Sequence, residues 1–306
     1  MMRALIVLFM VVMFSPSAMA SGVVVSIKPL HSLVAAVMKG DENQPEVLLS
    51  GGQSLHSFSL KPSQAKMLAD ADLVFYISDE FELFMDKALD GAPRRLQRIA
   101  LSKVSGLTLL PSRMGRGFEP HEHHHEHGHE HETQERHDLH LWMSPANAKV
   151  MVQEIARQLS VAYPQKKVLY MHNAELLVGK LDALDASLAA RMEKLKGRPF
   201  VVFHDAYQYF EQRYGLRAAG SLTVHPERGL SAGHLADLRA KIASAQAVCV
   251  FREPQFDGAV IDNLLAGTGA KSAALDPEGA LLAPSEALYF EMMEAIAAGF
   301  ESCLAA

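Results

Sequence analysis

Short apolar runs alternate with longer segments of helical periodicity along most of the 306-residue chain. The runs are rich in Val, Leu and Phe and have the length typical of buried strands. Repeated strand–helix units favour parallel sheets with helices packed on both faces. In the first half of the chain we expect strands at 23–27, 45–50 and 71–78 and helices at 31–40 and 61–71, followed by apolar runs at 98–102 and 107–111.

A second block of the same alternation begins near residue 198. It predicts strands at 199–204, 247–251 and 270–275 and helices at 205–215, 231–245, 258–269 and 285–305. Two such blocks in a chain of this length indicate two α/β lobes, each large enough to have its own core. Ligands of parallel sheets bind beyond the carboxyl ends of the strands, so polar residues at those ends are of special interest.

The two blocks are separated by a long helical segment that runs from Pro164 to Gly197. Its large apolar residues recur at spacings of three and four, which places them on one helical face. They are Leu177, Leu181, Leu184, Leu188, Met192 and Leu195. The segment would be roughly 50 Å long. We interpret it as a rigid strut between the lobes rather than a coiled-coil arm, because the repeat is short and rich in alanine. A preceding helix at 144–163 has Ser144 as its predicted cap and Pro145 in its first turn.

Residues 1–20 have the pattern of a secretory signal peptide. Arg3 supplies the positive charge, residues 4–14 are apolar but too few to span a bilayer, and Ala18-Met19-Ala20 is a small-x-small cleavage motif. No cysteine directly follows this motif, and no other segment has eighteen uninterrupted apolar residues. We therefore expect an exported, soluble chain without membrane insertion. Its net charge of −6 does not favour binding to nucleic acid.

Cys249 and Cys303 are the two cysteines of the chain. Export favours a disulfide between them, which would stabilise the fold by roughly 3–5 kcal/mol through the entropy of the unfolded chain. Two buried thiols or a thiolate metal site are the alternatives, although the wide spacing and the absence of a CxxC motif make a zinc–sulfur site a weak one.

The stretch "HEHHHEHGHEH" at 121–131 contains seven of the fifteen histidines. They are His121, His123, His124, His125, His127, His129 and His131. The letters match the H-E-x-x-H motif of zinc proteases, but that motif needs a stable helix, and Gly128 and the lack of apolar residues argue against one. We interpret the stretch as a low-affinity metal-capture arm; an idle polar loop is the alternative.

Four residues with metal-binding side chains lie where a strand gives way to a helix. His204 and Asp276 directly follow predicted strands, His56 lies in a loop after 45–50, and His140 just precedes the helix at 144–163. Three further histidines occur inside helical patterns and are interpreted as structural: His31, His172 and His234. A lone histidine would be weak support for a metal site, so the hypothesis depends on the four residues together with the histidine-rich stretch.

Several segments resemble the periplasmic zinc-binding proteins of the ZnuA type, which are the solute-binding components of zinc ABC transporters. The matching segments are "SIKPLHSLVAAV", "HSFSLKPSQAKMLADADLVFYIS", "DLHLWMSPANA", "VVFHDAYQYFEQRYGL", "CVFREPQF" and "ALDPEG". The resemblance implies two βα lobes with parallel sheets, one long rigid connecting helix and a metal site in the cleft between the lobes. It also implies primary ligands at His56, His140 and His204.

Two departures from the family pattern concern the site. Members can have a glutamate beside the first histidine, whereas here Ser54-Leu55 precedes His56, so water or Asp276 must complete the ligand set. His225 in "LTVHPERG" is an additional histidine that we interpret as solvated, with a second metal site as the alternative. Three imidazoles and one oxygen suit Zn²⁺ at roughly 2.0–2.2 Å per ligand, although copper and nickel also favour nitrogen ligands.

The resemblance implies a monomeric protein that captures Zn²⁺ in the periplasm and delivers it to the membrane permease of an importer with a cytoplasmic ATPase. The predicted division is a signal peptide at 1–20, an N-terminal lobe at 21–163 with a histidine-rich loop at about 113–137, a connecting helix at 164–197 and a C-terminal lobe at 198–306. The alternatives are an exported zinc-dependent hydrolase and a periplasmic zinc buffer without transport. A hydrolase would need a general base, for which Glu253 and Asp205 are the nearby candidates; we interpret Asp205 instead as supporting His204 or capping a helix.

Overall fold

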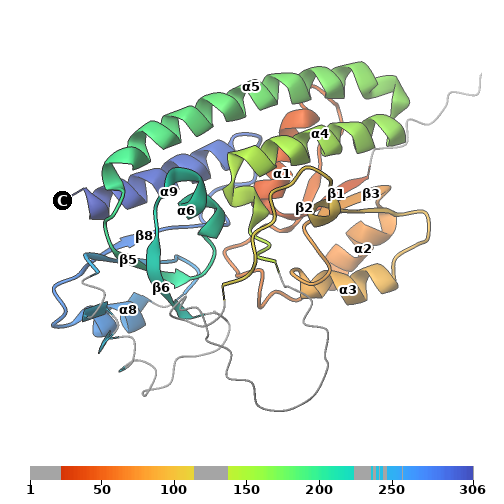
Figure 1. Ribbon diagram of the computed structural model, residues 1–306. Helices are drawn as coiled ribbons and strands as arrows, with labels where there is room; N and C mark the ends of the chain where they lie inside the picture. Colours follow the sequence, from red (N-terminus) through yellow and green to blue (C-terminus); the bar gives the residue numbers. More distant parts are fainter. Residues whose placement is uncertain are drawn as a thin grey trace, which may run out of the picture.

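The computed structural model describes residues 22–113, 137–223, 236, 239–240, 242–243, 247–256 and 258–305. Two four-stranded parallel sheets organise these residues (Figure 1). The first has the order β2-β1-β3-β4, from β1 (Val23–Ile27), β2 (Glu46–Leu49), β3 (Leu73–Tyr76) and β4 (Gln97–Ala100). The second has the order β6-β5-β7-β8, from β5 (Phe200–His204), β6 (Ala218–Thr223), β7 (Cys249–Arg252) and β8 (Lys271–Ala274). The prediction of two α/β lobes is confirmed.

The helices of the N-terminal lobe are α1 (Lys28–Val37), α2 (Pro62–Asp70) and α3 (Leu83–Asp90), with a short 3₁₀ turn, η1, at Leu101–Lys103. Helix α1 follows β1 without a break and begins three residues before the predicted start. Pro29 permits this because proline is tolerated in the first turn, where its missing N–H would have no helical partner. Helix α3 was not predicted from the sequence.

The C-terminal lobe contains α6 (Gln208–Tyr214), α8 (Gly258–Leu265) and α9 (Leu288–Leu304) among its described residues. Strand β6 was missed from the sequence because "AAGSLT" has few of the β-branched and aromatic residues that mark strands. Its neighbour β5 nonetheless pairs with it in parallel, from Phe200 opposite Ala218 to His204 opposite Thr223. The helix expected at 231–245 lies largely outside the described residues.

The predicted strut is confirmed as α5 (Lys167–Met192), with 3₁₀ turns η3 (Pro164–Lys166) and η4 (Glu193–Leu195) at its ends. It contacts α1 and α4 (Pro145–Ala162) on the first lobe and α6 and α9 on the second, and Figure 1 shows it lying across both. Helix α4 has the predicted cap, since the Ser144 hydroxyl accepts from the backbone N–H of Asn147 at 3.4 Å. No helix within the described ranges is both long and apolar enough to cross a membrane.

Hydrogen bonds that do not involve α5 also join the two lobes. Lys28, at the start of α1, donates its ammonium group to the carbonyls of Gly279, Ala280 and Leu282 in the second lobe at 2.8–3.2 Å. The indole N–H of Trp142 donates to the carbonyl of Pro277 at 2.7 Å. Helix α9 contacts α1 as well as α5. The loop after β8 is therefore held against the first lobe by hydrogen bonds that the sequence did not reveal.

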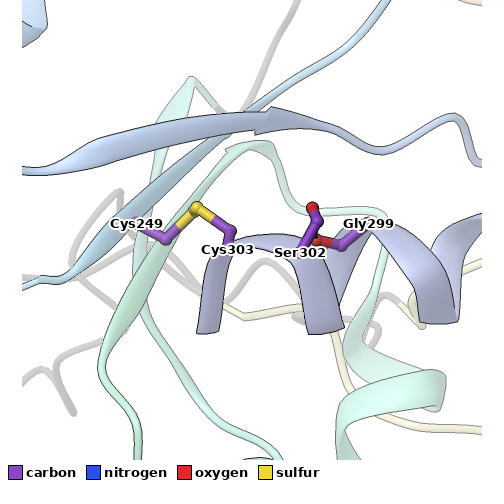
Figure 2. Close-up of a disulfide and its surroundings, with 4 residues drawn as sticks. All are labelled: Cys249, Gly299, Ser302 and Cys303. Atoms are coloured by element: carbon purple, nitrogen blue, oxygen red, sulfur yellow. Dashed lines mark hydrogen bonds between the residues drawn. A yellow bond between two sulfur atoms is a disulfide. The ribbon is translucent and has the colours of Figure 1, made fainter. Parts of the chain in front are cut away.

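The predicted disulfide is confirmed: Cys249 of β7 is bonded to Cys303 of α9, with their Cα atoms 6.0 Å apart. Figure 2 shows that the bond joins the last turn of the helix to the sheet. Both residues are buried in the main apolar core. The bridge thus fixes α9 on the second lobe, close to the sheet that carries His204.

Candidate metal centre

His56, His140 and His204 converge from three separate segments. Each offers one ligand atom, and these three atoms lie within 4.8 Å of one another. His204 is the last residue of β5, His140 directly precedes the 3₁₀ turn η2 (Leu141–Met143), and His56 lies in the loop between β2 and α2. The two sheets therefore direct imidazoles from both lobes toward one point, as the rule on strand ends predicts.

The imidazole of His204 is oriented by a buried carboxylate. Its Nδ1 lies 2.6 Å from Oε1 of Glu253, the residue that follows β7 next to β5 in the sheet. Burial opposes protonation of His204, but the charge of Glu253 and this hydrogen bond outweigh it and raise the pKa of the imidazole. Because the carboxylate accepts from Nδ1–H, the lone pair of Nε2 remains directed at the centre.

His140 has an equivalent support from its own segment. Its Nδ1 donates to Oδ1 of Asp138 at 2.8 Å, and the same oxygen accepts from the backbone N–H of His140 at 3.0 Å. The hydroxyl of Tyr209 donates to the Asp138 carbonyl at 2.6 Å and anchors the segment to the second lobe. Two of the three imidazoles are thus fixed in the tautomer in which Nε2 can bind a cation.

The spacing of the two Nε2 atoms fits a shared tetrahedral ion. The Nε2 atoms of His140 and His204 are 3.3 Å apart. Two nitrogens bound to one zinc at about 2.0–2.1 Å in tetrahedral geometry would be about 3.3–3.4 Å apart. The nitrogens therefore already lie close to the positions that zinc coordination requires, and the residues present fit this ion.

His56 is held by a short turn in its loop. The Ser54 hydroxyl accepts from the backbone N–H of His56 at 3.3 Å, and the Ser54 carbonyl accepts from Ser57 at 3.2 Å. Leu55 is buried in the main core and anchors the turn. The ring of His56 lies 5.5 Å from that of His204 in an edge-to-face arrangement.

The ring of Phe81 covers the centre on one side and was not predicted as part of the site. It makes edge-to-face contacts with His56 and His140, at centroid distances of 5.5 and 5.0 Å. Its loop is fixed by the next residue, Glu82, whose carboxylate accepts from the backbone N–H groups of Ile77 and Ser78 at 2.7 and 2.9 Å. An apolar ring at this place limits the access of water to the imidazoles.

The Asp276 carboxylate organises the loop after β8. It accepts from the side chain of Gln255 and the backbone N–H of Glu278 at 3.2 Å, and from the N–H of Leu281 at 3.4 Å. Burial raises its pKa above the ordinary value. The loop turns at Gly279, where φ is 63°, a region that favours glycine. Asp276 does not belong to the cluster of three histidines within the described residues, so its role as fourth ligand stays a prediction.

The Asp205 carboxylate is held by an arginine, and its charge contributes to the raised pKa of His204. This carboxylate forms a two-oxygen ion pair with Arg113, which also donates to both oxygens of Glu211 at 2.9 Å. Helix α6 begins after Tyr207 and has no side-chain cap, so the suggestion that Asp205 caps a helix is wrong. Asp205 thus fixes Arg113 beside His204 and the metal centre.

The remaining histidines are not part of the centre as far as the structure describes them. His31 is buried and lies 3.0 Å from the Pro45 carbonyl through its Nε2, in keeping with a structural role, and His172 is exposed on α5. His225, His234 and the seven histidines of 121–131 lie outside the described residues. Pro111 and His137, which flank the histidine-rich stretch, pair in an isolated antiparallel bridge.

Two α/β lobes, a long helix across both and a cluster of cation ligands between them define a two-lobed solute-binding protein with a metal site. The family model for the zinc-uptake complex component A, periplasmic (ZnuA), matches residues 23–303. The high-affinity zinc uptake system protein ZnuA of Brucella abortus (strain 2308) is 40% identical over 92% of this chain and 91% of its own length. The chain belongs to the ZnuA family.

Solved structures agree with this assignment. A crystal structure of ZnuA is 24% identical and superposes with a TM-score of 0.77, covering 93% of this chain and 99% of its own. A zinc-bound ZnuA from which residues 138–173 of that protein were deleted is 25% identical, with a TM-score of 0.74 and coverage of 94% and 99%. The arrangement of two parallel-sheet lobes is therefore the fold of this family.

Proposed function

We propose that this chain captures Zn²⁺ with high affinity in the periplasm and delivers it to the membrane permease of a zinc ABC importer. The observation that carries the proposal is the convergence of His56, His140 and His204 from both lobes on one point. Membership of a family described by zinc uptake supports zinc as the cargo, and three imidazoles form a ligand set suited to it. The permease, its cytoplasmic ATPase and a monomeric state belong to the same proposal.

The residues of the site have separate roles in this proposal. The three imidazoles bind the ion through nitrogen. Glu253 and Asp138 accept from the Nδ1–H groups of His204 and His140, which keeps the rings oriented and strengthens them as ligands. Phe81 limits contact with water. Because these groups are already in place, little conformational entropy is lost when the ion binds, which favours high affinity.

The histidine-rich stretch is proposed to be a separate, weaker capture arm. Its flanking residues Arg113 and His137 are held near the centre, Arg113 by the ion pair with Asp205 and His137 by the bridge to Pro111. An arm attached at these points would raise the local concentration of zinc beside the primary site. Deletion of residues 116–136 should therefore leave one tightly bound zinc ion and remove the weaker ones.

The alternatives are less well supported by the geometry. A zinc hydrolase would need a carboxylate available as general base, but Glu253 is bonded to His204 and Asp205 to Arg113. A zinc buffer without transport would share the site, so only transport distinguishes it. Membership of a family described as a component of a zinc-uptake complex favours transport.

Growth of a deletion strain in zinc-depleted medium tests transport. We expect the full-length chain to restore growth, whereas a variant with His56, His140 and His204 all replaced by alanine should not. Added zinc should restore growth of every strain. A buffer without transport would instead leave growth of the deletion strain unaffected when zinc is scarce.

A further inference from the structure

Side chains of helix α6 in the second lobe form hydrogen bonds with the backbone of the first lobe. The amide of Gln208 donates to the carbonyl of Pro111 at 3.2 Å. The hydroxyl of Tyr209 accepts from the backbone N–H of Leu110 at 3.1 Å and donates to the carbonyl of Asp138 at 2.6 Å. The start of α6 is therefore bonded to two backbone segments of the opposite lobe at once.

The Tyr209 hydroxyl takes the place of one bond in a short antiparallel ladder. Pro111 and His137 form an isolated antiparallel bridge, so Leu110 and Asp138 are the next pair of opposite residues. Such a pair ordinarily exchanges two backbone hydrogen bonds. One is present, since the N–H of Asp138 donates to the carbonyl of Leu110 at 2.9 Å. The reciprocal bond passes through the hydroxyl of Tyr209, which is inserted between Leu110 and Asp138.

This inserted hydroxyl is connected to a metal ligand through a single residue. The carboxylate of Asp138 accepts from Nδ1 and from the backbone N–H of His140 at 2.8 and 3.0 Å. The ring of Tyr209 is buried in the main apolar core, which fixes the position of its hydroxyl. His204 lies at the end of β5, just before α6. The second lobe thus supplies His204 and also holds the segment that carries His140, with the two Nε2 atoms 3.3 Å apart.

Arg113 attaches the same part of the first lobe to α6 at a second point. Its guanidinium group is paired with Asp205 and with both oxygens of Glu211. Glu211 in turn accepts from the backbone N–H of Ala218, the first residue of β6, at 2.9 Å. Separation of a buried ion pair is costly because both charges lose their partner. Movement of this segment away from the second lobe must break the ion pair and the bonds of Tyr209 together.

We propose that Tyr209 is a positioning residue of the metal centre, which holds His140 against the second lobe and thereby slows the release of zinc. The inference rests on the proposed function. An ion held by several imidazoles leaves after they detach one by one, and His140 detaches more easily when its segment can move. Tyr209 restrains that movement, with Arg113 as the second attachment. Without the hydroxyl, Leu110 and Asp138 can bond directly, which draws Asp138 away from α6 and misaligns His140.

The rate of zinc release tests this role. The chain is loaded with less than one equivalent of zinc, so that the tightest site is filled first, and is mixed rapidly with an excess of a chromogenic chelator. Tyr209→Phe should release zinc about threefold to tenfold faster than the wild type, the factor expected for the loss of one buried hydrogen bond. Tyr214→Phe is the matched control on the same helix, since the hydroxyl of Tyr214 donates to Asp185 at 3.0 Å.

The control separates positioning from stability. Tyr214→Phe loses a bond to a carboxylate, so its metal-free chain should be destabilised at least as much as that of Tyr209→Phe. Its rate of zinc release should nevertheless stay within about twofold of the wild-type rate, because Tyr214 bonds α5 and not the segment of His140. Denaturant unfolding of each metal-free variant measures the stability and verifies that the variant is folded.

A second pair of variants tests the other attachment and replaces the first pair if Tyr209→Phe does not fold. Arg113→Lys keeps the positive charge but loses the planar fork that bonds two carboxylates, so zinc release should be about twofold to fivefold faster. Arg213→Lys is its control, because Arg213 pairs with Asp185 on the far side of α6 from the centre's own segment. The rate of release from Arg213→Lys should equal that of the wild type.

Three outcomes would contradict these expectations, and they are distinguishable. Release from Tyr209→Phe at the wild-type rate would overturn the proposal and leave the hydroxyl a contribution to stability alone. Equal acceleration in Tyr209→Phe and Tyr214→Phe would also overturn it, because a general loss of stability would then explain the rates. A wild-type chain that loses its zinc to the chelator within the mixing time would instead overturn the proposed function itself.

Discussion

Each lobe contains a buried glutamate beyond its third strand that bonds a side chain near the end of its first strand. In the first lobe Glu82 accepts from the hydroxyl of Ser26 in β1. In the second lobe Glu253 accepts from the imidazole of His204 at the end of β5. The two sheets have the same order of strands, so the two pairs occupy comparable places in the fold.

The difference between the pairs lies in what the glutamate supports. Glu82 also accepts from the backbone N–H groups of Ile77 and Ser78, and it fixes the loop that carries Phe81. Glu253 has the imidazole and, at 3.4 Å, the hydroxyl of Tyr207 as partners. A buried carboxylate thus stabilises a loop in one lobe and orients a metal ligand in the other. Replacement of each glutamate in turn should therefore separate effects on stability from effects on metal binding.

The largest loss of zinc affinity is expected when one of the three histidines is replaced. His204→Ala should lower zinc affinity by about a hundredfold to a thousandfold, because zinc sites with four ligands bind with about 10–16 kcal/mol and one ligand is lost. His56→Ala and His140→Ala should have effects of the same order. Ser26→Ala, the counterpart in the first lobe, should leave the affinity within about threefold. Competition with a tight chelator measures these values, and a single zinc retained by all three histidine variants would contradict the assignment.

The disulfide should stabilise the second lobe without contributing to metal affinity. The bridge closes a loop with a sequence separation of 54, for which the chain-entropy account predicts about 4 kcal/mol of stabilisation. The double variant Cys249→Ser, Cys303→Ser should therefore unfold at lower denaturant concentration yet bind zinc as tightly as the wild type. An affinity that falls in parallel with stability would show instead that the bridge shapes the metal centre.

Two single variants, in which either glutamate is replaced by glutamine, test the comparison between the lobes. Glu253→Gln should weaken zinc binding by about tenfold to a hundredfold, because His204 loses the carboxylate that orients it. Glu82→Gln should weaken zinc binding much less, because Glu82 acts on the centre only through the loop that carries Phe81, and should mainly alter the stability of the metal-free chain. Calorimetric titration with zinc and denaturant unfolding of both variants give the two readouts. Equal losses of affinity in both variants would contradict the separation of roles.

The hydrogen bond between Glu253 and His204 should also have a smaller effect, on the pH dependence of zinc binding. The charge of Glu253 raises the pKa of His204 despite its burial, and a protonated imidazole cannot bind zinc. Affinity should therefore begin to fall as pH decreases through this raised pKa, by about tenfold per pH unit for each proton that competes. In Glu253→Gln the pKa should be lower, so the fall should begin at lower pH. If the dependence of zinc affinity on pH is the same in Glu253→Gln as in the wild type, this explanation is wrong.

The two lobes, the connecting helix α5 and the three histidines could be predicted from the sequence because local patterns indicate them. Strand–helix alternation specifies parallel sheets, and ligand-type residues such as His204 directly follow apolar runs. The cysteine pairing could also be expected, since two cysteines in a chain with a predicted signal peptide have few alternatives. In each case the informative residues are close in sequence or few in number.

What the sequence did not reveal depends on contacts between distant segments. Strand β6 is composed of small residues and is recognised only by its pairing with β5. Phe81 reaches the histidines from a loop far away in sequence, and a phenylalanine does not mark a metal site by itself. Asp276 was chosen for its place after a strand, whereas its bonds to Gln255 and to the loop backbone become visible only in three dimensions.

X-ray absorption spectroscopy at the zinc edge tests the central claim most directly, namely that imidazoles from both lobes hold one ion. The sample would be the chain without residues 116–136, loaded with zinc and passed over a chelator, so that the histidine-rich stretch cannot contribute ligands. The account predicts one zinc with three imidazole nitrogens and one oxygen at about 2.0–2.2 Å. Two or fewer imidazoles, a sulfur ligand, or the loss of tight zinc on deletion would contradict it.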